Sequence, residues 1–283
     1  MRLGGKRESG NVEDKRGFGL GGGSIGIGGV ILALVVSYFT GISPATLLGM
    51  LPNSDSPANQ TTSANAPAKD QAASFVGKVL ADTEDTWQTI FRETGREYQD
   101  PKLVLFTGAT SSACGTGRQE MGPFYCSLDQ KIYIDLAFYQ QLRERFNAPG
   151  EFAQAYVIAH EVGHHVQNLL GISAKVRAAQ ERSGNAATVN ALSVRLELQA
   201  DCYAGVWGHH ADKLRHIVEP GEIDQALAAA SAIGDDQLQT KSQGGSRPET
   251  FTHGTSAQRV HWFKRGIESG DPKQCNTFEA KTL

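Results

Sequence analysis

The sequence lacks an excess of basic residues: 27 Lys and Arg face 30 Asp and Glu, which leaves a formal net charge of −3. Proteins that bind nucleic acid normally carry a strong basic excess, so this balance argues against a nucleic-acid partner. Cysteine is also scarce, and four cysteines in 283 residues exclude a small disulfide-dense fold. With 40% hydrophobic residues the chain can still bury a core, which excludes a wholly disordered protein.

Charge is missing altogether from one long segment. Residues 17–54 contain no Asp, Glu, Lys or Arg, and residues 25–39 within them are almost wholly apolar. About 20 apolar residues suffice to cross a bilayer, so residues 25–51 are predicted to form a transmembrane signal-anchor. The basic residues before this segment predict that residues 1–24 are a cytoplasmic tail. A cleaved signal peptide is the alternative, but the apolar stretch is long for one and no cleavage motif follows it closely.

The next segment lacks large apolar residues. Residues 52–71 contain no Val, Ile, Leu, Met or aromatic residue, which predicts a flexible linker. Residues 72–283 are left as one globular domain. The sequence thus predicts a single-pass protein of the inner (cytoplasmic) membrane, attached by its N-terminal helix, with the C-terminal domain on the periplasmic or extracytoplasmic side.

The four cysteines fit an exported domain, because cysteines pair in an oxidising compartment. Cys114 and Cys126 bracket a short glycine-rich stretch. Their pairing is therefore the expected bridge, which leaves Cys202 to pair with Cys275. Sequence alone permits three connectivities, and four free thiols are the alternative for a cytosolic domain.

Apolar residues recur at helical intervals in much of the predicted domain. Helices are expected at residues 72–98, 136–146, 151–170, 185–210, 222–239 and 256–267. Short β-like runs lie at residues 103–106 and 131–135. This pattern predicts an α+β fold, mainly helical with a small β-sheet. If the second run forms a sheet edge, it is a candidate for binding an extended peptide by strand addition.

The helix predicted at residues 151–170 contains the string His160-Glu161-Val162-Gly163-His164. Histidines four residues apart lie on one helix face, so both imidazoles can reach one metal ion. Glu161 is placed to take a proton from the water that attacks a carbonyl group. The flanking residues are apolar, and a buried helix with two unpaired histidines would be costly. We therefore predict a Zn²⁺ site with Glu161 as general base, in preference to an ordinary helix with surface histidines.

A zinc hydrolase needs a third protein ligand, and the helix predicted at residues 185–210 offers two carboxylates. Glu197 and Asp201 lie four residues apart among apolar neighbours on this helix. Glu197 is the candidate third ligand, and Asp201 is expected to accept a hydrogen bond from His160. The two carboxylates could exchange these roles, and salt bridges to nearby basic residues are the alternative for both.

The chain resembles known zinc peptidases in these motifs. His160 to His164, followed by Glu197 and Asp201, is similar to the gluzincin pattern, and the whole chain resembles the bacterial neutral zinc metallopeptidase family of YpfJ type. The segments that carry the second resemblance are Asn11–Gly17, Gly122–Cys126, His160–Gln167, Glu197–Cys202 and Phe251–Ser256. The resemblance implies a membrane-anchored, zinc-dependent peptidase with a zincin-like domain that acts on peptide or protein substrates.

Thr252-His253 and Arg259 keep the spacing of a motif in membrane zinc peptidases of the CAAX-processing and heat-shock type, although Gly254 replaces the usual proline. This resemblance implies that His253 binds the substrate carbonyl or the developing oxyanion, a large contribution to catalysis. It also implies that Arg259 pairs with a carboxylate of the site. The alternative is that residues 252–256 only cap the following helix.

A different class of function also fits the motifs: a membrane-anchored structural or binding protein whose zinc only stabilises the fold. Structural zinc sites usually have four protein ligands, often cysteines. The sequence offers three clear ligands, with Cys202 as a conceivable fourth. The sequence therefore favours the peptidase. A fourth protein ligand would indicate a structural zinc site, and an open fourth position would indicate a catalytic one.

Overall fold

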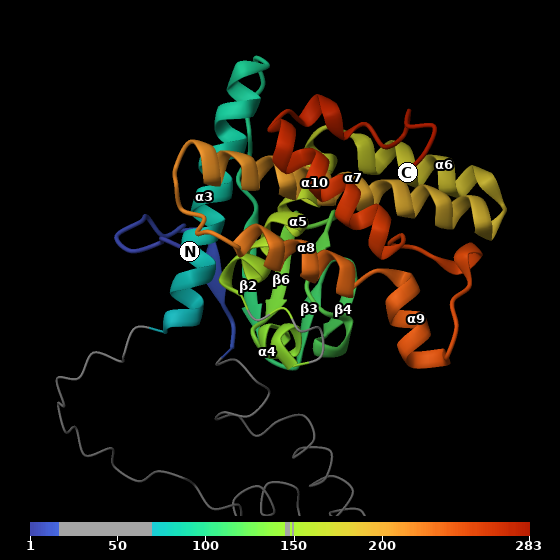
Figure 1. The fold of residues 1–283 in the computed structure, drawn as a ribbon, viewed down its shortest axis with the longest axis horizontal. Coiled ribbons are helices and arrows are strands. Elements are labelled where there is room, and N and C mark those ends of the chain that lie inside the picture. The colour runs from blue at the N-terminus through green and yellow to red at the C-terminus, as the bar shows by residue number, and fades with distance from the viewer. Residues whose placement is uncertain (17–69, 145–147, 149) are drawn as a thin grey trace, which may run out of the picture. The chain divides into compact units, whose positions relative to one another are not determined.

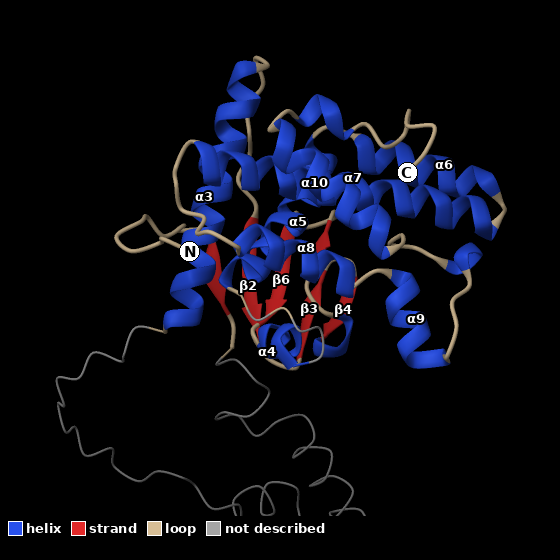
Figure 2. Ribbon diagram, viewed as in Figure 1, coloured by secondary structure: helices blue, strands red, loops and turns tan. Residues whose placement is uncertain are grey.

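The computed structural model describes residues 1–16, 70–144, 148 and 150–283, which belong to one folded unit (Figure 1). Its strands are β1 (Val12–Asp14), β2 (Lys102–Phe106), β3 (Ala109–Ser112), β4 (Gly115–Arg118), β5 (Phe124–Cys126) and β6 (Lys131–Asp135). Its α-helices are α3 (Gln71–Glu93), α4 (Ala137–Glu144), α5 (Glu151–Leu169), α6 (Ile172–Ser183), α7 (Ala186–Lys213), α8 (Glu222–Ala232), α9 (Asp235–Gln243) and α10 (Ser256–Ser269). Single 3₁₀ turns lie at Gln119–Met121, Pro248–Thr250 and Pro272–Cys275. Helices dominate and the sheets are small (Figure 2), which confirms the predicted α+β class.

The larger sheet has the strand order β1-β2-β6-β5. Strands β1, β2 and β6 run parallel, and β5 is antiparallel to β6. The two central strands are apolar and almost fully buried, as expected for a sheet covered on both faces. Strand β6 has a neighbour on each side, so residues 131–135 do not meet the condition under which they were a candidate for strand addition. The edge strands are β1 and β5.

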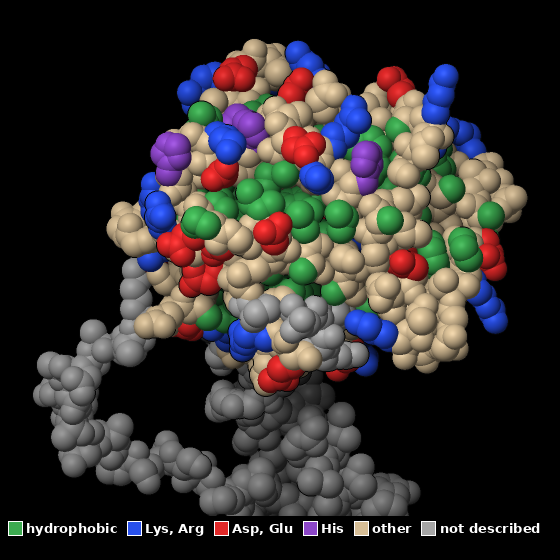
Figure 3. Space-filling model, in the orientation of Figure 1, with side chains coloured by type: hydrophobic (Ala, Val, Ile, Leu, Met, Phe, Trp, Pro, Cys, Tyr) green, Lys and Arg blue, Asp and Glu red, His purple; other side chains and the backbone are tan. Residues whose placement is uncertain are grey.

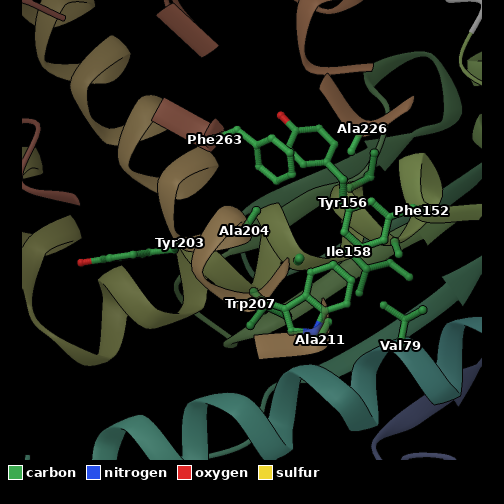
Figure 4. Close-up of a cluster of buried hydrophobic side chains, with 14 of the residues drawn as sticks. Val79, Phe152, Tyr156, Ile158, Tyr203, Ala204, Trp207, Ala211, Ala226 and Phe263 are labelled. Atoms are coloured by element: carbon green, nitrogen blue, oxygen red, sulfur yellow. The ribbon is translucent and has the colours of Figure 1, made fainter. Parts of the chain in front are cut away.

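The core lies between the central helices α5, α7 and α10. Figure 4 shows the aromatic side chains that fill it: Phe152 stacks on Trp207 at 5.5 Å, and Tyr156 meets Phe263 edge-on at 5.0 Å between ring centroids. Helices α7 and α10 are in direct backbone contact at Gly205. A Cβ atom at this position would lie 2.1 Å from the carbonyl oxygen of Phe263, so only glycine allows the contact. A substitution of this glycine would therefore force the two helices apart.

The first sixteen residues are part of the same folded unit. β1 adds to the sheet beside β2, and it is preceded by residues that enclose the buried carboxylate of Glu84 on α3. Arg7 and Asn11 donate hydrogen bonds of 3.0 and 2.9 Å to this carboxylate, and the hydroxyl of Ser9 donates a third. Paired strands must share a compartment. The pairing therefore conflicts with the predicted topology, in which a membrane separates residues 1–24 from residues 72–283.

The described residues contain no helix that is long and apolar enough to cross a membrane. The predicted anchor at residues 25–51 lies outside them, as does all but the end of the predicted linker. On the face drawn in Figure 3, hydrophobic side chains gather in the middle, where α8 and α10 lie, and charged groups surround them.

Both predicted disulfides are confirmed. Cys114 pairs with Cys126 and ties the start of β4 to the edge strand β5. Cys202 of α7 pairs with Cys275 in the last 3₁₀ turn. The second bridge joins residues that are far apart in the sequence, and it holds the C-terminal segment against α7.

Candidate metal centre

The candidate site lies where α5 and α7 cross. His160, Glu161 and His164 come from α5, which is buried on nearly all sides, and Glu197 comes from α7. The helices can approach closely because Gly163 faces α7: a Cβ atom there would lie 2.9 Å from the carbonyl oxygen of Ala200. The glycine inside the His-Glu-x-x-His string thus allows the carboxylate of Glu197 to reach both histidines.

The three predicted ligands converge on one point. The Nε2 atoms of His160 and His164 lie 3.2 and 3.4 Å from the two carboxylate oxygens of Glu197. One donor atom from each residue can be chosen so that all three lie within 4.8 Å of one another. Two imidazole nitrogens and one carboxylate oxygen are a donor set that suits zinc and leaves a coordination position open. The residues present therefore fit a zinc ion.

Asp201 lies on the other side of His160. Its Oδ1 atom is 2.8 Å from the Nδ1 atom of His160, so it holds this ring in place and leaves Nε2 directed at Glu197. Asp201 also accepts hydrogen bonds of 2.8 and 2.9 Å from Arg259, and one from the hydroxyl of Tyr156. The geometry thus gives Glu197 and Asp201 the expected positions, and Arg259 pairs with a site carboxylate as predicted.

This cluster is strongly charged and largely buried. Burial alone would raise the pKa of Asp201, but the charges of Arg259 and His160 lower it to about 2. Burial likewise opposes protonation of His160, yet the carboxylates of Asp201 and Glu197 raise its pKa to about 10 in the metal-free protein. In the absence of zinc, His160 is therefore protonated at neutral pH.

Zinc affinity should rise with pH for this reason. Zinc binds the neutral imidazole, so each bound ion must displace at least the proton on His160. At pH values below the raised pKa of His160, displacing this proton lowers zinc affinity about tenfold for each pH unit. We therefore expect zinc to bind at least ~100-fold more tightly at about pH 8 than at about pH 6. Competition with a chelator, corrected for the chelator's own protonation, measures the slope. An affinity that does not change over this interval would contradict the protonated state of His160.

A cavity of about 700 Å³ opens over the cluster. Its floor contains His160, Glu161, His164 and Glu197. Its walls come from the 3₁₀ turn before β5, from β5 itself, from α6 and from α9, and include Met121, Phe124, Tyr125, Val176, Arg177 and Leu238. Met121 is 64% exposed at the rim. A cleft of this size, lined by both apolar and polar side chains, can hold a peptide segment over the predicted metal ligands.

His253 also lines this cavity, on the loop before α10. The side chain of Asp235 accepts three backbone N–H bonds from this loop, at residues 252, 253 and 254, and its other oxygen lies 3.2 Å from Nδ1 of His253. This carboxylate raises the pKa of His253, which burial would lower. Thr255 caps α10 in a capping box with Gln258, so the loop does cap the helix, as the alternative interpretation held. The same loop also carries His253 at the cavity.

Asp235 was not predicted as a residue of the site, because the segment 222–239 reads as one helix. The structure breaks this helix at Gly234, where a Cβ atom would lie 2.4 Å from the backbone nitrogen of Ser256. Asp235 therefore begins a new helix, α9, directly against the loop of His253. The glycine within the helical pattern was the one available signal for the break.

His165 is buried and does not reach the predicted ligands. Its Nδ1 atom lies 3.0 Å from the hydroxyl of Tyr125, and its Nε2 donates a 2.7 Å hydrogen bond to the carbonyl oxygen of Gln99. Asn168 donates a hydrogen bond to the same hydroxyl at 3.2 Å. These contacts fix Tyr125 in the wall of the cavity, a position that only the tertiary structure reveals.

The fold and the site define a class: a mainly helical α+β protein with a three-residue candidate metal site on the floor of a cleft. The chain belongs to the family described as "Putative neutral zinc metallopeptidase", whose model matches residues 1–278. This membership identifies zinc as the metal for the site.

The chain is also similar to individual bacterial proteins. The chain is 51% identical to the uncharacterized protein YpfJ of Escherichia coli (strain K12), over 98% of this chain and 99% of the relative. It is 46% identical to the uncharacterized protein Rv2575 of Mycobacterium tuberculosis (strain ATCC 25618 / H37Rv), over 66% of this chain and 65% of the relative. No solved structure matches the chain.

Proposed function

We propose that the protein is a zinc-dependent endopeptidase with a zincin-like site. The observation that carries the proposal is the convergence of His160, His164 and Glu197 on the floor of a cleft that Glu161 also lines. Three protein ligands leave room for water and substrate, which is the arrangement of catalytic zinc sites. The cleft has a volume of about 700 Å³, which is large enough for a segment of a peptide chain.

Glu161 is the proposed general base. When bound, zinc polarises a carbonyl group and makes water a better nucleophile. Burial raises the pKa of Glu161 above the usual value for a glutamate. The carboxylate is therefore a stronger base, and its protonated form persists to higher pH. Glu161 takes a proton from the attacking water and passes it to the leaving amine.

His253 is the proposed donor to the developing oxyanion. Its Nδ1 atom faces Asp235, so Nε2 is the ring atom available to the substrate. The raised pKa of His253 favours the protonated ring, which can donate at both nitrogens. A donor fixed in advance near developing negative charge stabilises the transition state without reorganisation at the moment of reaction.

The edge strand β5 is the proposed peptide-binding element. One side of β5 pairs with β6, and Phe124 and Tyr125 of β5 line the cleft. An extended substrate can add to a free strand edge through backbone hydrogen bonds, with its side chains directed into apolar pockets. This assigns to β5 the role that the sequence suggested for residues 131–135.

The alternative, a structural zinc site, has less support. Cys202 is bonded to Cys275 and is not available as a fourth ligand. Among the residues that the structure describes, the metal-binding group of His, Cys, Asp and Glu side chains has three members. The attachment to a membrane through residues 25–51 stays a prediction.

The full-length protein tests the proposal directly. We expect about one zinc per chain and cleavage of an unfolded protein such as casein, lost with a chelator and restored by zinc. Metal content and the appearance of new peptides are the two measurements. Zinc at full occupancy without cleavage of casein or of a random peptide library would contradict the peptidase and favour the structural site.

A further inference from the structure

A buried glutamine holds the second ligand histidine. Gln167 lies one helical turn after His164 on α5, is fully buried, and its Oε1 atom is 2.9 Å from Nδ1 of His164. His160 has its Nδ1 atom fixed by Asp201 in the same way. The two ligand rings are thus held from behind by different groups, one charged and one neutral.

The orientation of this glutamine is determined by its other contacts. Its Nε2 atom donates to the carbonyl oxygen of Leu196 at 2.7 Å and to Oε1 of Gln199 at 3.1 Å. Gln199 in turn donates to the carbonyl oxygen of Cys275 at 2.9 Å. Backbone carbonyls only accept hydrogen bonds. If the oxygen and nitrogen of either side-chain amide were exchanged, the amide oxygen would face a carbonyl oxygen, so the orientation of both amides is determined.

We infer that Gln167 is a positioning residue that sets the tautomer of His164 and ties it to the helix that carries Glu197. Because Oε1 of Gln167 must accept, the Nδ1 atom of His164 carries the proton and Nε2 keeps its lone pair for the metal. The same amide binds the carbonyl of Leu196, the residue before Glu197, and so links two ligands on two helices. Gln199 and the Cys202–Cys275 disulfide fasten this link to the C-terminal segment.

The test is Gln167→Met, which keeps the length of the side chain and removes its hydrogen bonds. Loss of such a supporting contact typically weakens metal binding by about 10–100-fold, and we expect a loss in this range for zinc, measured by chelator competition. In the metal-free protein at a pH where His164 is neutral, ¹⁵N NMR should show one tautomer for the wild type and a mixture for the variant. A merely structural glutamine would not change the tautomer.

Gln225→Met is the matched control, because the side-chain oxygen of Gln225 on α8 is buried without a hydrogen-bond partner among the described residues. It should leave zinc affinity unchanged. If Gln167→Met does not fold, Gln199→Met removes the next contact and should weaken zinc binding less, in the same direction. Unchanged affinity and an unchanged tautomer in the variant that folds would overturn the inference.

The inference rests on the proposed ligand set but not on catalysis. A wild-type protein that binds zinc and cleaves nothing would contradict the proposed function while the effect of Gln167→Met could still be measured. A wild-type protein that binds no zinc would contradict the ligand set itself.

Discussion

Glu161→Gln is expected to reduce peptide hydrolysis by at least about 100-fold while zinc stays bound at full occupancy, because a general base typically contributes ~10²–10⁴-fold to the rate. The amide has the size of the carboxylate but cannot take a proton from water. Zinc should remain because Glu161 is not one of the three residues whose donor atoms converge. Initial rates on a peptide substrate, with zinc measured in the same sample, give both numbers.

The matched control is Glu181→Gln on the exposed face of α6, which makes the same chemical change outside the cleft. It should cleave at the rate of the wild type. Loss of zinc from Glu161→Gln would show that this carboxylate is a ligand, and an undiminished rate would remove it from the mechanism. Either result would contradict the role proposed here.

The metal site was predictable from the sequence because its spacing is local. Residues four apart share a helix face whatever the rest of the fold does, so the pairs His160/His164 and Glu197/Asp201 needed only the helix prediction. The contact between the two helices was less certain, and it depends on Gly163, which the motif does not require. The disulfide between Cys114 and Cys126 was predictable for a similar reason, since few residues separate the two.

The features that were missed have weak local patterns or depend on distant partners. β1 has three residues and no alternation of apolar side chains, so it is recognisable only through its pairing with β2. α6 buries a single residue, Val176, and thus shows no apolar face. Gln167 follows the two ligand histidines in the sequence, but its hydrogen-bond partners Leu196 and Gln199 lie on another helix. A sequence pattern does not reveal such contacts.

Asp201→Asn is expected to lower both stability and zinc affinity. Asp201 is fully buried, and its charge is the partner of Arg259, which is buried as well. Breaking a buried ion pair by removing one charge typically costs about 3–5 kcal/mol, because the remaining charge is left without compensation. The same change weakens the hold on His160, so zinc binding should fall by about 10–100-fold. Urea unfolding of the metal-free protein and chelator competition measure the two effects separately.

A second ion pair, between a buried carboxylate and a partly exposed arginine, separates the loss of stability from the loss of zinc affinity. Asp82 on α3 binds Arg215 and the indole N–H of Trp207, and it makes no hydrogen bond to a metal ligand. Asp82→Asn should therefore also destabilise the metal-free protein, by a smaller amount because Arg215 is partly exposed, and leave the zinc affinity of the folded protein unchanged. If both variants lose stability and neither loses affinity, Asp201 only stabilises the fold. If Asp201→Asn alone loses affinity, the carboxylate behind His160 is part of what makes this site bind zinc.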